Sequence, residues 1–141
     1  MKNKAVILCV DDEVVILNTL KKQLKNAFAD KYDYEMAENA DEALEIIEEM
    51  DEDETAVLLI VSDWLMPGMK GDEFLIQVHQ KHPRIIKIML TGHADEVAVQ
   101  RAIEQANLAE CLHKPLNTEE LIQSIQSSLK WLSGNLRGTS V

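Results

Sequence analysis

The sequence predicts an α/β domain built on a doubly wound parallel sheet. Five short apolar runs alternate along the chain with segments of helical periodicity, and this order is typical of strands that are each followed by a covering helix. The third run, AVLLIVS at residues 56–62, is almost uniformly apolar, as expected of a central strand with helices on both faces. A chain of 141 residues has room for one such domain.

The first half of the chain predicts two strands and two helices. After a first strand that ends at residue 10, apolar residues recur at helical spacing. They are Val14, Leu17, Leu20, Leu24 and Phe28. A short second strand is expected at residues 34–37, and Asn39 then offers a helix N-cap, with Glu42 at the third helical position. This second helix is expected to fade into a solvated acidic loop at residues 51–54.

The middle of the chain predicts a loop, a helix and a strand. Residues 66–71 are rich in Pro and Gly and indicate a loop, which is followed by a third helix. The apolar residues of that helix are Phe74, Leu75 and Val78. Pro83 then separates the helix from a fourth strand at residues 85–90 (IIKIML).

The last part of the chain predicts one weakly and one strongly apolar helix. The fourth helix has a narrow face of mostly small side chains, Val99, Ala102, Ile103 and Ala106, so we expect it to be lightly anchored. A fifth strand at 110–113 precedes a helix that is expected to end at Gly134. Its stripe is Leu121, Ile122, Ile125, Leu129 and Leu132. The domain should therefore cover residues 4–132, with 133–141 as a C-terminal tail or the start of a linker.

The composition restricts the function. Twenty-five acidic and 14 basic residues give a formal charge of −11, so the surface should repel nucleic acid and anionic membranes. No apolar run approaches the roughly 20 residues of a membrane span, and none of signal-peptide length follows Met1. Cys9 and Cys111 lie in predicted strands without the spacing of a metal site, which predicts reduced core thiols. We expect a soluble cytoplasmic protein.

Polar residues that can carry chemistry stand where the predicted strands end. Asp11 and Asp12 follow the first strand and Asp63 follows the third, while Thr91 and Lys114 follow the fourth and fifth. The carboxyl ends of parallel strands share one edge of a sheet, so these side chains should converge. Three acids at one point repel each other unless a cation lies among them, and oxygen ligands suit Mg²⁺. A cation, a phosphate and a carboxylate nucleophile would explain all these positions.

Four motifs at these strand ends carry a resemblance to a known family. They are V-D-D-E at 10–13, S-D-W-L-M-P-G-M-K-G at 62–71, L-T-G at 90–92 and H-K-P at 113–115. In this order they resemble the receiver domain of two-component response regulators, the CheY-like family, over about residues 4–132. The resemblance implies a flavodoxin-like sheet of strand order 2-1-3-4-5 with five flanking helices.

The resemblance also implies a role for each site residue. Asp63 would be the phosphoacceptor, and Mg²⁺ would be held by Asp12, Asp63 and the backbone carbonyl of Leu65, with Asp11 acting through water. Thr91 would donate to a phosphoryl oxygen. Lys114 would pair with Asp63 and later with the phosphate. The donor would be a sensor histidine kinase or a histidine phosphotransfer protein, and an output domain could follow this segment.

Simpler interpretations of the same residues remain open. Asp63 could be a helix cap or a turn former, and the acids at 11 and 12 could complement a helix dipole. Thr91 could be an ordinary strand residue, and Lys114 an ordinary surface lysine. Two other functions also remain: a receiver-like interaction module that takes no phosphate, and an aspartate-nucleophile phosphohydrolase similar to haloacid dehalogenases. In that second family the nucleophile comes first, in an Asp-x-Asp pair, which the adjacent pair here does not match.

One position departs from the family pattern. Many receivers carry Tyr or Phe three residues before the lysine, and Cys111 stands there in this chain. The usual pairing of a hydroxyl and an aromatic ring in the switch therefore cannot operate as it does in the family. His93, two residues past Thr91, is a candidate to influence access of water to an acyl phosphate. His79, His82 and Trp64 are expected to have no special role, the histidines being solvated and the tryptophan packed.

Overall fold

The computed structural model describes residues 4–92 and 96–138, with residues 132–138 described by their backbone alone. It contains a five-stranded parallel sheet of order β2-β1-β3-β4-β5, which confirms the predicted fold class and strand order. The strands are β1 (Val6–Val10), β2 (Asp33–Ala37), β3 (Val57–Asp63), β4 (Ile86–Thr91) and β5 (Glu110–His113). The helices are α1 (Val14–Phe28), α2 (Ala40–Glu52), α3 (Gly71–Lys81), α4 (Glu96–Ala106) and α5 (Thr118–Gly138).

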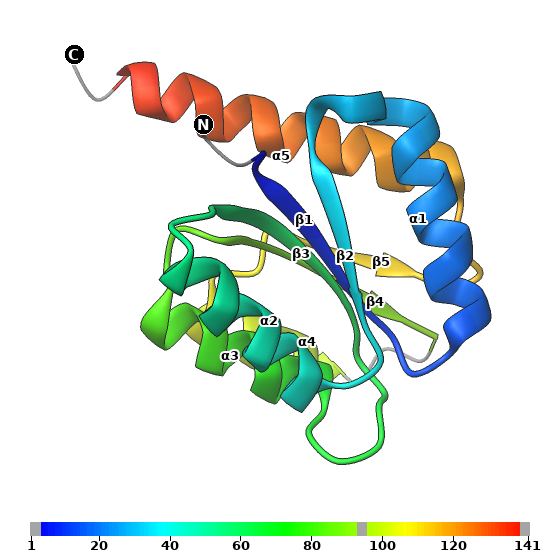
Figure 1. Ribbon diagram of the computed structural model, residues 1–141. Helices are drawn as coiled ribbons and strands as arrows, with labels where there is room; N and C mark the ends of the chain where they lie inside the picture. Colours follow the sequence, from blue (N-terminus) through cyan, green and yellow to red (C-terminus); the bar gives the residue numbers. More distant parts are fainter. Residues whose placement is uncertain (1–3, 93–95, 139–141) are drawn as a thin grey trace.

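Helices cover both faces of the sheet. Helices α1 and α5 lie on one face, and α2, α3 and α4 lie on the other (Figure 1). Because strand side chains alternate in direction, each face has its own apolar core. The core beneath α1 and α5 includes Ile7, Cys9, Leu17, Leu20, Leu24, Leu59, Val61, Ile88, Leu121 and Ile125. The core beneath the other three helices includes Leu8, Ala43, Ile47, Ile60, Phe74, Leu75, Val78, Met89 and Ala102.

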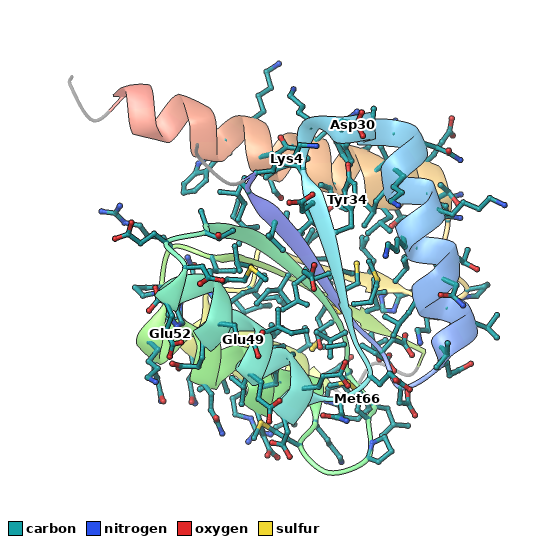
Figure 2. The ribbon with its side chains drawn as sticks, viewed as in Figure 1. Lys4, Asp30, Tyr34, Glu49, Glu52 and Met66 are labelled. Carbon is teal, nitrogen blue, oxygen red and sulfur yellow. The ribbon has the colours of Figure 1, made fainter. Side chains whose placement is uncertain are left out.

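Helix α2 begins at the predicted N-cap but ends later than predicted. The Asn39 side chain accepts a hydrogen bond of 2.8 Å from the backbone N–H of Glu42, which confirms the predicted cap. Helix α2 continues to Glu52 instead of fading at residue 51, and the backbone N–H of Asp53 still bonds to Glu49 O. The acidic side chains of Glu49 and Glu52 are exposed and project away from the sheet (Figure 2).

Helix α5 also exceeds its predicted length. It runs to Gly138, so the prediction that Gly134 ends it is wrong. A glycine inside a helix costs only about 1 kcal/mol relative to alanine, and it ends a helix only where the backbone leaves the helical conformation. Leu132, the last residue of the predicted stripe, lies outside the described side chains. No helix in the described part of the chain is both long and apolar enough to cross a membrane.

Helix α4 is anchored by even smaller side chains than the sequence predicted. Its buried residues are Ala98, Ala102 and Ala106, while the predicted anchor Ile103 is 47% exposed. The three alanines repeat every four residues and so form one row along the helix, whereas Ile103 is rotated about 100° from Ala102. Ala102 and Ala106 are buried as predicted and Val99 is partly buried against the core, so only Ile103 is wrong, and Ala98 is buried in addition. That the helix is lightly anchored stays a prediction.

A buried lysine lies beneath the same layer of helices. Lys87 of β4 is 1% exposed, and its Nζ donates to the carbonyl of Ile85 at 2.6 Å and lies 3.0 Å from His79 Nδ1. Burial lowers the pKa of Lys87 to about 8, and burial followed by the nearby ammonium lowers the pKa of His79. The expectation that His79 and His82 are solvated is wrong, because both are partly buried.

Candidate functional site

The strand register brings the predicted site residues to one edge of the sheet. Val10 pairs with Ser62, so Asp11 and Asp63 follow neighbouring positions of β1 and β3. Asp63 pairs in turn with Leu90, next to Thr91. Thr91 pairs with His113, and its carbonyl accepts a hydrogen bond of 2.9 Å from the backbone N–H of Lys114. The convergence that the sequence predicted is therefore a direct result of the parallel pairing.

Three carboxylates form a compact cluster at this edge. Asp11 and Asp63 are buried, at 0% and 5% exposure, and Asp12 is exposed. One oxygen from each of the three lies within 4.8 Å of the others. Burial and the charge of Asp11 raise the pKa of Asp63 above its ordinary value, against the opposing effect of Lys114. Concentrated negative charge of this kind, supplied by oxygen ligands alone, fits a hard divalent cation.

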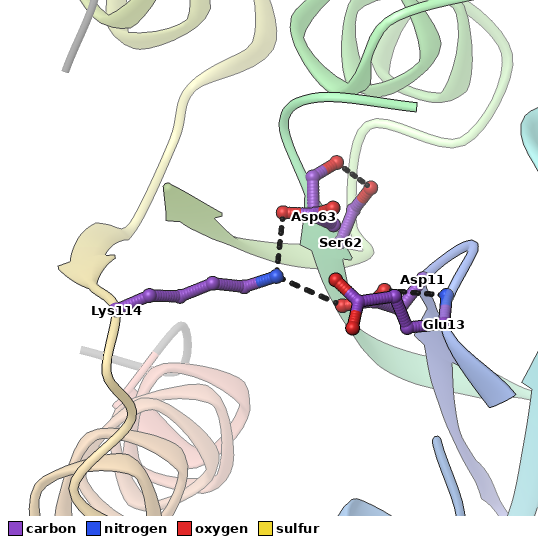
Figure 3. A network of polar contacts seen from close by, with 5 residues as sticks. All are labelled: Asp11, Glu13, Ser62, Asp63 and Lys114. Atoms are coloured by element: carbon purple, nitrogen blue, oxygen red, sulfur yellow. Dashed lines mark hydrogen bonds and ion pairs between the residues drawn. The ribbon is translucent and has the colours of Figure 1, made fainter. Parts of the chain in front are cut away.

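Lys114 bridges the two buried carboxylates. Its Nζ lies 3.1 Å from Asp63 Oδ1 and 3.2 Å from Asp11 Oδ2 (Figure 3). Burial acts to lower the pKa of Lys114, but the hydrogen bond to Asp63 and the charge of Asp11 outweigh it, so the net pKa is raised. The side chain is therefore a stable ammonium at neutral pH. The Lys114–Pro115 peptide bond is cis.

Short polar contacts also hold the two strand ends that carry the buried carboxylates. Asp11 Oδ1 accepts a hydrogen bond of 2.9 Å from the backbone N–H of Glu13, at the turn between β1 and α1 (Figure 3). The hydroxyl of Ser62 donates to the backbone carbonyl of Asp63 at 3.0 Å. The Asp11 carboxylate is thus held by its own turn as well as by Lys114. The Asp63 carboxylate, in contrast, is held by Lys114, and only the backbone of Asp63 is held by Ser62.

The loop after Asp63 is packed closely against the strand it leaves. The backbone N–H of Trp64 donates to Leu90 O at 2.8 Å, and Trp64 O accepts from the N–H of Gly71 at 2.8 Å. A Cβ atom at position 71 would lie 2.3 Å from Asp63 O, which is a steric clash. Glycine is therefore required at 71 to close the loop beside the aspartate.

The structure adds three residues that the sequence did not single out together. The indole Nε1 of Trp64 donates to Asp72 Oδ1 at 3.1 Å, and Arg101 Nη2 forms an ion pair of 3.0 Å with Asp72 Oδ2. The three residues come from a loop, from α3 and from α4, so no local spacing in the sequence connects them. The expectation that Trp64 has only a packing role is incomplete, because its N–H holds a buried carboxylate.

Other predicted residues are placed less fully. Thr91 is buried at the last position of β4, as expected of a strand-end residue. The side chain of Leu65 is exposed, and its carbonyl as a metal ligand stays a prediction. His93 lies outside the described residues. Cys111 is a half-buried free thiol that packs against the core beneath α2, α3 and α4, and burial raises its pKa.

A sheet of this order with acids and a lysine gathered at its carboxyl edge is the architecture of CheY-like domains. The chain belongs to the family of response regulator receiver domains, whose sequence profile matches residues 7–126. Receiver domains of two-component systems generally bind Mg²⁺ at an aspartate cluster, and the carboxylates of residues 11, 12 and 63 fit such an ion.

Individual relatives agree with this assignment. The chain is 27% identical over 127 residues to the hydrogenase transcriptional regulatory protein HoxA of Cupriavidus necator, and the match covers 90% of this chain and 24% of the relative. It is 27% identical over 124 residues to a cyclic di-GMP phosphodiesterase of Thermotoga maritima, covering 88% and 31%. A CheY-like receiver from Methanospirillum hungatei JF-1 superposes with a TM-score of 0.83 at 29% identity, covering 94% of this chain and 99% of that one. The chain thus spans about a quarter to a third of these two curated relatives.

Proposed function

We propose that residues 4–132 act as a phosphorylation-controlled signalling switch that accepts a phosphoryl group on Asp63 in the presence of Mg²⁺. The observation that carries this proposal is the position of Lys114, whose ammonium lies within 3.2 Å of both Asp63 and Asp11 beside a cluster of three carboxylates. An ordinary surface lysine or an ordinary helix-capping aspartate does not require this arrangement. The donor would be a sensor histidine kinase or a histidine phosphotransfer protein.

The residues of the chain would divide the work of phosphoryl transfer. Asp12, Asp63 and the carbonyl of Leu65 would hold Mg²⁺, with Asp11 acting through water, and the ion would neutralise charge on the phosphoryl oxygens. A carboxylate oxygen of Asp63 would form the new P–O bond while the P–N bond of the donor breaks and its electron pair returns to the imidazole. Lys114, kept protonated by its acidic neighbours, would then pair with a phosphoryl oxygen, and the Thr91 hydroxyl would donate to another.

Phosphorylation would act on the surrounding structure through charge. A phosphoryl group adds about −1.5 to −2 charges at neutral pH. This charge would bias the surface formed by α4, β5 and α5 between two packings. Because the two relatives described above are three to four times as long as the matched segment, we propose that the switch controls an output domain or a separate partner.

Treatment with acetyl phosphate and Mg²⁺, followed by intact-mass analysis, tests the proposal. We expect one added phosphoryl group on the wild type, none without Mg²⁺, and none on Asp63→Asn. Asp33→Asn is the matched control, because Asp33 is an exposed aspartate at the start of β2. A folded wild-type protein that gains no phosphoryl group would refute the proposal, and turnover of a generic phosphate ester would instead favour the phosphohydrolase.

A second candidate is a receiver-like interaction module that takes no phosphate. The specific observation in its favour is Cys111, which replaces the aromatic residue that many receivers use in switching. Mg²⁺ binding separates the two candidates, since an ion that binds the folded protein at 100 times its Kd stabilises it by about 2.7 kcal/mol. The switch predicts a melting temperature that rises with Mg²⁺ and depends on Asp12, whereas the module predicts no rise.

A further inference from the structure

Helix α4 is connected to the loop after Asp63 by a polar bridge. The central member of the bridge is Asp72 of α3, whose side chain is 2% exposed. One of its oxygens accepts from the Trp64 indole at 3.1 Å, and the other lies 3.0 Å from the Arg101 guanidinium on α4. The buried carboxylate of Asp72 thus joins Trp64, the residue that follows Asp63, to helix α4.

The Trp64 end of the bridge cannot move independently of Asp63. Trp64 directly follows Asp63 in the chain, and both of its backbone polar groups are hydrogen-bonded, one to β4 and the other to Gly71. Gly71 in turn lies against the Asp63 carbonyl. A change of position at Asp63 must therefore be transmitted to the Trp64 ring or be absorbed by breaking these contacts.

The Arg101 end of the bridge joins α4 to α3, in addition to the apolar contacts of the helix, which include the partly buried Val99. The buried residues of the helix are three alanines, each of which contributes one methyl group to the core. A buried carboxylate that loses one of its donors destabilises the structure strongly, because the remaining charge is left without its partner. The position of α4 should therefore depend on whether Asp72 keeps both partners, the hydrogen bond from Trp64 and the ion pair with Arg101.

We propose that Trp64, Asp72 and Arg101 couple the state of Asp63 to the position of α4. In this chain the bridge takes the part that the residue at position 111 has in receivers with an aromatic residue there. The inference rests on the proposed function, because it requires that Asp63 is modified. Coupling between two sites is reciprocal, so a substitution in the bridge must also change the binding of a phosphoryl analogue at Asp63.

The test uses hydrogen exchange of the α4 amides with and without beryllofluoride and Mg²⁺, on the whole chain. The variants are Trp64→Phe, which keeps an aromatic ring but removes the N–H, Arg101→Gln, and the two combined. We expect beryllofluoride to change α4 exchange at least about 5-fold in the wild type and less than about 2-fold in either variant. Since both substitutions break one bridge, the double variant should lose no more than either single variant.

Controls separate the bridge from general damage to the fold. Arg84→Gln removes an exposed arginine outside the bridge and should keep the wild-type response. Arg101→Lys keeps the charge and should restore part of the response if Arg101→Gln folds poorly. If the bridge variants are phosphorylated on Asp63 and their α4 exchange responds to beryllofluoride as in the wild type, the bridge proposal is wrong but the proposed function stands. The same conclusion follows if the losses of response in the two single variants add in the double variant. A wild type with neither phosphorylation nor response to beryllofluoride would overturn the proposed function together with the bridge.

Discussion

Helices α1 and α4 lie on opposite faces of one sheet and are held in place by different interactions (Figure 1). Helix α1 buries three leucines, Leu17, Leu20 and Leu24. Helix α4 buries three alanines and adds one ion pair from Arg101 to a carboxylate on α3. Fully burying a leucine contributes about 1.5–3 kcal/mol, whereas one methyl group contributes about 0.8 kcal/mol.

This difference indicates which side of the domain can respond to a change of charge. Apolar contacts are insensitive to charge, so the attachment of α1 should remain the same whatever the state of Asp63. Two buried ionisable residues, Asp72 of α3 and Lys87 of the underlying strand β4, lie on the face covered by α3 and α4, and their charges affect packing directly. On the face covered by α3 and α4, buried charges thus act on the helix packing in addition to the apolar core.

The largest effect should come from a cavity beneath α1. Leu20→Ala is expected to lower the free energy of unfolding by about 2–5 kcal/mol, because Leu20 is 1% exposed and its removal leaves an unfilled space. Ala102→Gly in α4 should cost only about 1 kcal/mol, mainly through helix propensity. Urea denaturation of both variants measures the difference. If both variants lost the same free energy of unfolding, α1 and α4 would be anchored equally.

A smaller effect should come from the buried charge of Lys87. Its pKa is about 8 in the folded protein and about 10.5 when solvated, so between these values the unfolded chain holds a proton that the folded one lacks. The wild type should therefore gain stability relative to Lys87→Met as the pH rises from 8 to 10.5, by about 1–3 kcal/mol. Urea denaturation at several pH values measures this gain. A stability difference that is independent of pH would show that burial does not disfavour the ammonium.

The carboxyl edge should show the opposite dependence on pH. The pKa of Asp63 is raised by burial and by Asp11, so its ionised form lowers the stability of the folded protein at neutral pH. Without Mg²⁺, Asp63→Asn should melt about 2–5 °C higher than the wild type at pH 7. This advantage should shrink as the pH falls through the folded pKa of Asp63 towards 3.8, because the wild-type side chain then becomes neutral as well. Calorimetry across this range checks it, and a lower melting temperature for the variant would contradict the raised pKa.

The carboxyl edge and the α1 layer could be predicted from the sequence for a common reason. Both depend on local patterns: apolar residues at helical spacing predict α1, and a polar residue that ends an apolar run predicts its place at the strand end. Parallel pairing then brings Asp11, Asp63 and Lys114 together without any further information. The Asn39 cap was predictable in the same way.

The α4 layer could be predicted only in part, because its contacts join distant parts of the chain. The ion pair of Asp72 and Arg101 depends on how two helices pack, and helical spacing within either helix does not encode this. Lys87 is a lysine in an apolar strand, and its burial results from the cover of helices on both faces of β4. Helical spacing predicts Ile103 on the apolar face beside Ala102 and Ala106, but the packing of α4 buries the row of alanines and leaves Ile103 exposed.

The smallest effect should come from an ion pair in which both side chains are exposed, in contrast to the pair of Arg101 with the buried Asp72. Lys81 Nζ lies 2.7 Å from Glu48 Oε1 and joins α3 to α2, but the two side chains are 71% and 51% exposed. Water and salt screen such a pair, and its two long side chains lose entropy when they are held together. Lys81→Gln should therefore leave the melting temperature unchanged within about 1 °C, whereas Arg101→Gln should lower it clearly. If both variants had the same melting temperature, the burial of Asp72 would not strengthen the ion pair with Arg101. The difference between α1 and α4 would then consist only of their apolar contacts.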